Sequence, residues 1–138
     1  MPTDKLLRML LPLYIAASLL HFSHNAEHLS SYPNLPPWLS RANIYFIWLA
    51  ITTAGCLGFL LYRKRRSSFG LVVLGLYATA GLGGLLHYTR ASFSAHTATM
   101  NVTILLEASI AAALLAVTVV AACRRGPVQC HVADSPEE

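Results

Sequence analysis

This sequence has little charge for its length. Of its 138 residues only 12% are charged and 55% are hydrophobic, and the mean hydropathy is +0.53. A soluble domain usually carries about twice that charged fraction. The composition therefore argues against an ordinary soluble domain and indicates a membrane protein.

Familiar catalytic and framework motifs are also missing. No serine lies in a Gly-x-Ser-x-Gly turn, and no glycine-rich loop ending in lysine suggests nucleotide binding. Three cysteines, an odd number, make no disulfide framework. The neighbouring Cys130 and His131 lie in a polar tail and are a weak metal signal. The first apolar run lacks a signal-peptide cleavage pattern, so we expect it to be retained.

What the chain does contain is long apolar runs, each near the ~20 residues that cross ~30 Å of hydrocarbon. They predict an all-α, antiparallel four-helix transmembrane bundle formed by residues 1–126. Residues 127–138 are predicted to be a disordered cytoplasmic tail. The helices are expected at about residues 6–29, 44–62, 69–88 and 98–122.

The basic residues are distributed unevenly between the two ends of this predicted bundle. Eight of the ten flank one end, and only Arg41 and Arg90 flank the other. By the positive-inside rule both termini are then cytoplasmic, in a plasma or inner membrane. The Arg63–Arg66 run is interpreted as a topology signal that also touches anionic lipid, so we expect no nucleic-acid partner.

The connections on the opposite, outer side differ in character. Residues 30–41 contain three prolines and Trp38, which predicts a stiff loop lying over the bundle mouth as a short lid. Ser40 is the expected N-cap of the second helix, and Pro12 predicts a local kink in the first. Small residues near Gly83 and Gly84 are expected to let helices approach closely.

Five of the six histidines lie near the outer end of the bundle. On the first helix His21, His24 and His28 fall within an arc of about 60°. On the fourth, His96 and Glu107 share one face, about 16 Å apart along the axis. Polar groups at membrane depth are costly, so they mark a functional site by default.

The depths of these residues predict two layers. In the deep layer His21 pairs with Glu107, which is also the candidate catalytic residue. The shallow layer gathers the four remaining outer histidines around a common point. Neutral imidazoles with a carboxylate are typical ligands of zinc, copper or iron. The predicted metal ligands are therefore His24, His28, His87 and His96, with His21 and Glu107 as deeper candidates.

Several functions agree with this pattern. A metal with an open position would serve a membrane enzyme acting on a lipid-like substrate. A closed metal site would serve a metal-handling protein. Alternatively, His21 and His87 would clamp a haem b in an electron-transfer protein. A further alternative is a structural or pH-responsive subunit of a membrane complex that needs no cofactor.

Overall fold

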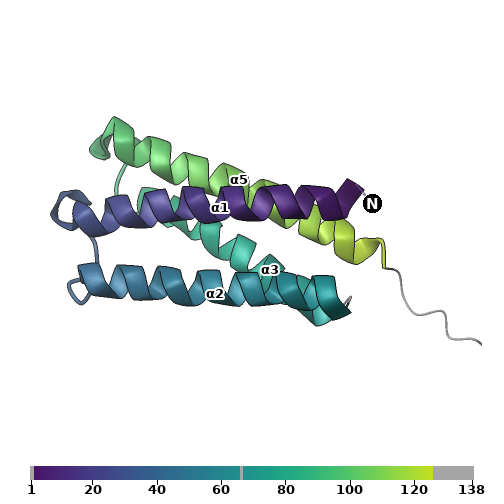
Figure 1. The fold of residues 1–138 in the computed structure, drawn as a ribbon. Coiled ribbons are helices and arrows are strands. Elements are labelled where there is room, and N and C mark those ends of the chain that lie inside the picture. The colour runs from purple at the N-terminus through teal and green to yellow at the C-terminus, as the bar shows by residue number, and fades with distance from the viewer. Residues whose placement is uncertain (1, 66, 126–138) are drawn as a thin grey trace, which may run out of the picture.

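In the computed structural model, described for residues 2–65 and 67–125, the chain is all-helical within that part. Four helical stretches are long and apolar enough to span a membrane. The predicted tail, residues 127–138, lies outside the described residues, as does Arg66. The long helices are α1 (Pro2–Glu27), α2 (Arg41–Arg65), α3 (Ser68–Gly81) and α5 (Ala98–Cys123), shown in Figure 1.

The sequence predicts one uniform α-helix for the third span, but the structure divides this span into three segments. After α3 the backbone tightens into the 3-10 helix η2 (Leu82–Leu86) and then resumes as the short α4 (His87–Arg90). Gly83 and Gly84 lie in the tightened segment. Glycine weakens an α-helix, and a stretch of 3-10 helix inside a span is typical of a hinge or a functional site.

The connections at the histidine end contain two further 3-10 helices, η1 (Leu29–Ser31) and η3 (Phe93–Ala95). The backbone N–H of Asn43 donates to Ser40 Oγ at 3.2 Å, which confirms the predicted N-cap of α2. Pro12 lies inside α1 without ending that helix. Asn34 adopts a left-handed φ of 56°, as asparagine in a turn can.

The core runs along the facing sides of the helices. α1 packs on α5 and α2, while α3 packs on α2 and α5. Leu7, Leu74 and Leu114 are fully buried between them. Large apolar side chains also cover the outside: Phe46 is 71% and Leu76 67% exposed. Such an apolar exterior suits lipid and would be a liability in water.

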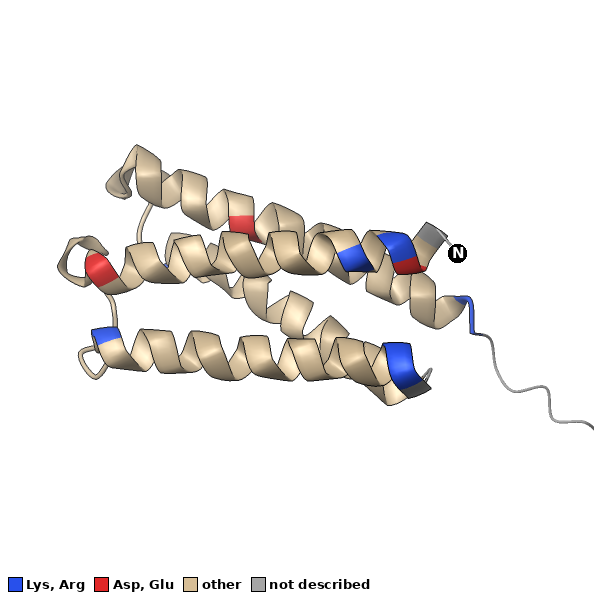
Figure 2. Cartoon of the chain, viewed as in Figure 1, with Lys and Arg blue, Asp and Glu red and all other residues tan. Residues whose placement is uncertain are grey.

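The basic end of the bundle is held together by polar contacts between the helix ends. Arg124 donates to Thr3 Oγ1 at 3.0 Å, and Tyr62 hydrogen-bonds the Asp4 carboxylate. The Arg125 guanidinium lies over the Tyr62 ring, 4.6 Å from its centroid. The beginning of α1 and the ends of α2 and α5 therefore meet at one end, where most of the blue segments in Figure 2 lie.

Helices α2 and α3 approach most closely near this end, at a pair of glycines. A Cβ built on Gly70 would lie 2.6 Å from the carbonyl oxygen of Gly58. That oxygen belongs to the backbone of α2 and cannot move aside as a flexible side chain can. Further along, the third span leaves α2, and its η2 segment packs on α5. The bundle is thus tight at its basic end and looser at its histidine end.

Candidate functional site

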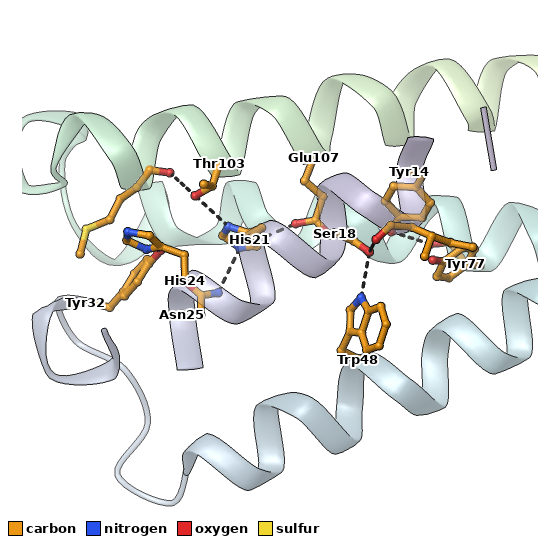
Figure 3. A network of polar contacts seen from close by, with 12 residues as sticks. Tyr14, Ser18, His21, His24, Asn25, Tyr32, Trp48, Tyr77, Thr103 and Glu107 are labelled. Atoms are coloured by element: carbon orange, nitrogen blue, oxygen red, sulfur yellow. Dashed lines mark hydrogen bonds and ion pairs between the residues drawn. The ribbon is translucent and has the colours of Figure 1, made fainter. Parts of the chain in front are cut away.

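Two buried titratable side chains, His21 of α1 and Glu107 of α5, face each other inside the bundle. His21 Nε2 lies 3.7 Å from Glu107 Oε2, and the side chains are only 2% and 1% exposed. Figure 3 shows the carboxyl group directed at the imidazole. The proximity inferred from helix depth is present in the structure.

Hydrogen bonds fix the His21 ring on both sides. The amide of Asn25 donates to Nε2 at 3.1 Å, and Nδ1 lies 3.4 Å from Thr103 Oγ1. The Thr103 hydroxyl itself donates to the Met100 carbonyl at 3.0 Å, so it accepts from the ring. This network places the proton of neutral His21 on Nδ1, so the unprotonated Nε2, which accepts from Asn25, is the nitrogen on the side of Glu107.

The Glu107 carboxyl group, by contrast, has no hydrogen-bond partner within the described part of the chain. Both Oε1 and Oε2 are buried and unsatisfied. A buried polar group without a partner is destabilising by about 1–3 kcal/mol, and a bare buried charge by more. A Cβ built on Gly84 would lie in ordinary contact, 3.5 Å from Oε2, and one on Gly83 would meet nothing within 4 Å, so the close helix approach predicted at these glycines is not found.

Above this pair the remaining outer histidines form a continuous series of ring contacts centred on His87. Its ring centroid lies 5.6 Å from that of His21, 6.1 Å from that of His96 and 5.1 Å from that of Tyr32. Tyr32 in turn contacts His24, whose ring lies 4.6 Å from that of His28. We call these five histidines and Tyr32 the histidine network.

Two shallow histidines already have protein partners. His96 Nδ1 donates to the Ser92 carbonyl at 2.9 Å, so its Nε2 is the unprotonated nitrogen, and this atom is buried without a partner. His24 Nδ1 shares a hydrogen bond of 2.8 Å with the Tyr32 hydroxyl.

The predicted metal centre at His24, His28, His87 and His96 is not supported by this geometry. Among residues 2–65 and 67–125 no group of three or more histidine, cysteine or acidic side chains is placed to hold a metal ion.

The haem alternative, with His21 and His87 as axial ligands, stays a prediction. The two rings touch edge to face, with 5.6 Å between their centroids, and both His21 nitrogens lie within hydrogen-bond distance of protein groups. In the structure these side chains form a polar network of hydrogen bonds and ring contacts.

Comparison of this chain with protein-family models, with curated proteins and with solved structures gives no match. The site must therefore be interpreted from its own chemistry.

Sequence reasoning missed part of the polar interior. Tyr32, in the proline-rich loop, is only 4% exposed and joins the histidines. The indole N–H of Trp48 donates to Ser18 Oγ at 3.0 Å. Deeper still, Tyr14 donates to the Tyr77 carbonyl at 3.2 Å. Polar groups thus continue from the histidine network toward the bundle centre (Figure 3).

Tyr32 gives the first prediction. Burial raises the pKa of its phenol from 10 to about 12, an effect that the Thr103 side chain opposes. Because the pKa is raised in the folded state, the neutral Tyr32 phenol contributes its full stabilisation below pH 10. This contribution to the free energy of unfolding is lost as the pH rises toward about 12. Replacing Tyr32 with phenylalanine should lower the free energy of unfolding by about 1 kcal/mol at neutral pH. The variant should also lose less stability than the wild type above pH 10.

Tyr45→Phe is the matched control, because the Tyr45 hydroxyl donates to Glu27 in an exposed position at 2.8 Å. Unfolding in detergent, followed by circular dichroism as a function of pH, measures both variants. Equal stability losses for the two variants, with identical alkaline profiles, would contradict the role given to buried Tyr32.

Proposed function

We propose that this chain is a multi-pass integral membrane protein that holds and exchanges a proton at the His21–Glu107 pair, as a proton-linked or pH-responsive membrane component. The observation that carries the proposal is the Glu107 carboxyl group, which is buried, lacks a hydrogen-bond partner in the described chain and faces the unprotonated nitrogen of His21. Intramembrane carboxylate and histidine chains are typical of proton relays.

The pair can share a proton without leaving a net charge in the bundle. When the Asn25 amide turns away from Nε2, a protonated Glu107 can donate from Oε2 to that nitrogen, and transfer of the proton gives a carboxylate beside an imidazolium. Burial favours the first, uncharged arrangement. The amide of Asn25 can adapt by rotating, because its oxygen is buried without a partner and would accept from a protonated Nε2.

The histidine network supplies the route to the surface. His87 contacts His21 on one side and His96 on the other, and the exposed His28 ends the series. The titratable side chains next along the polar interior are Tyr14 and Tyr77 on the inner side and His87 and His24 on the outer side. We infer that protons enter from the histidine end, because the series of ring contacts on that side reaches the exposed His28.

Infrared spectroscopy tests this proposal: the band of a protonated carboxyl group should be present in the wild type and absent from the Glu107→Gln variant. The network itself needs no metal or haem. A membrane partner subunit would use the proton held at this site.

We further propose an antiparallel arrangement with both termini in the cytoplasm of a plasma or inner membrane. The contacts between Thr3 and Arg124 and the basic residues gathered at the same end support it. The domain then comprises residues 1–126, and the histidine network opens at the outer face.

Cysteine labelling tests this orientation. In a background lacking the native cysteines, Ser31→Cys at the histidine end should react with a membrane-impermeant maleimide added to intact cells. Lys64→Cys at the basic end should react only after the cells are opened, because both positions are exposed but on opposite sides. The reverse pattern would overturn the orientation.

A further inference from the structure

A cavity separate from the His21–Glu107 pair lies where α2 and the third span diverge. Its volume is about 260 Å³. Apolar side chains from α1 and α2, including Phe22, Ile44 and Ile47, form its walls, and Trp38 and Leu39 of the proline-rich loop also line it. Neither Glu107 nor His21 lines this cavity.

The cavity also borders the lipid-facing exterior. Ile47 is 41%, Leu86 60% and Trp38 65% exposed, so its lining continues onto the apolar surface of the bundle. A Cβ built on Gly83, another lining residue, would meet nothing within 4 Å. A molecule dissolved in the bilayer can therefore reach the cavity sideways, between α2 and η2.

The polar lining is confined to a few groups, of which Arg90 carries a positive charge and His87 can donate a hydrogen bond. Arg90 has no carboxylate within 4.0 Å in the described chain, whereas Arg41 at the same end pairs with Glu27 at 2.7 Å. His87 makes ring contacts, but neither of its nitrogens has a hydrogen-bond partner among the described residues. No acidic side chain lines the cavity. This lining is complementary to an anion at the membrane surface.

We propose that this cavity binds a single-chain amphiphile with a carboxylate head, such as a fatty acid. The carboxylate accepts hydrogen bonds from Arg90 and His87, and the chain lies against Phe22, Ile44 and Leu86. A cavity of ~150 Å³ holds benzene, so this one has room for about ten carbon atoms. That volume suits one acyl chain and not the two of a phospholipid. The inference goes beyond the proton site and does not rest on it.

Tryptophan fluorescence offers a direct test, because Trp38 lines the cavity and the chain has only 2 tryptophans. The full chain in maltoside micelles is titrated with ω-bromodecanoic acid, whose bromine quenches a nearby indole. We expect saturable quenching of the wild type. Gly83→Phe should abolish it by filling the cavity, and Arg90→Gln should weaken binding about tenfold. Leu76→Phe, which adds the same ring to the lipid face, should bind as the wild type does.

Titrations of the wild-type protein with other brominated compounds identify the class of ligand. ω-Bromodecanol should bind about tenfold more weakly than the acid, and brominated phosphatidylcholine should not quench saturably. Equal binding of alcohol and acid, unsaturable quenching that Gly83→Phe leaves unchanged, or saturation by the phospholipid would each overturn the proposal. Glu107→Gln should still bind the acid, so the failure of this proposal and that of the proton site are distinguishable.

Discussion

His21→Leu is expected to lower the free energy of unfolding by about 2–3 kcal/mol, far more than a histidine at the surface would. The substitution removes the polar partner facing the Glu107 carboxyl group and leaves the ring's hydrogen-bonding neighbours Thr103 and Asn25 without it. Leaving buried polar groups without partners accounts for an effect of this size. Unfolding by a denaturing detergent in mixed micelles measures the loss.

His28→Leu provides a matched control, because His28 is exposed and lies at the end of the network, where its ring contacts that of His24. Its effect should stay within about 0.5 kcal/mol. Glu107→Gln should likewise be more damaging than Glu27→Gln, since the Glu27 ion pair with Arg41 is largely exposed and such pairs contribute about 0–1 kcal/mol.

The double variant His21→Leu with Glu107→Gln isolates the interaction between the two side chains. Residues in contact are non-additive by about 0.5–3 kcal/mol, so the double variant should be less destabilised than the sum of the single variants. Strict additivity would show that the two groups do not interact and would remove the basis of the deep site.

Gly70→Ala is the second substitution with a large expected effect. The added methyl group would lie 2.6 Å from the carbonyl oxygen of Gly58 and 2.5 Å from the backbone nitrogen of Tyr62. Backbone cannot move aside as a side chain can, so α2 and α3 must separate, at a loss of about 2–3 kcal/mol. The thermal unfolding midpoint in detergent should fall accordingly.

The control for this substitution is Gly83→Ala, in the same span. A Cβ at that position meets nothing within 4 Å, and alanine favours helical backbone over glycine by about 0.5–1 kcal/mol. We therefore expect unchanged or slightly raised stability. If Gly70→Ala were as stable as Gly83→Ala, the close packing of α2 against α3 would be wrong.

The existence of four spanning helices follows from the sequence because long apolar runs admit few other structures. Their boundaries were less accurate: α1 begins at Pro2 and α2 at Arg41, where polar first turns lie outside the apolar windows. The 3-10 segment Leu82–Leu86 was missed, because a continuous apolar pattern does not reveal a local change in hydrogen bonding.

The depth of the candidate-site residues along the helix axes was predictable from the sequence, but their contacts between helices were not. The fixed rise per residue brought His21 and Glu107 to similar depth. Helix rotation and loop path decide which ring nitrogens are free, and neither follows from spacing. For that reason the metal ligand set was predicted but is not supported, while Tyr32 and its bond to His24 were missed.

The most direct test of the proton-holding site is the infrared carbonyl band of a protonated carboxylic acid, recorded on the full chain in lipid. We predict such a band at neutral pH, absent from Glu107→Gln and shifted in His21→Leu. The Glu27→Gln spectrum should retain it. Wild-type and Glu107→Gln spectra that coincide in this region at every pH would show that Glu107 holds no proton, and would contradict the proposed function.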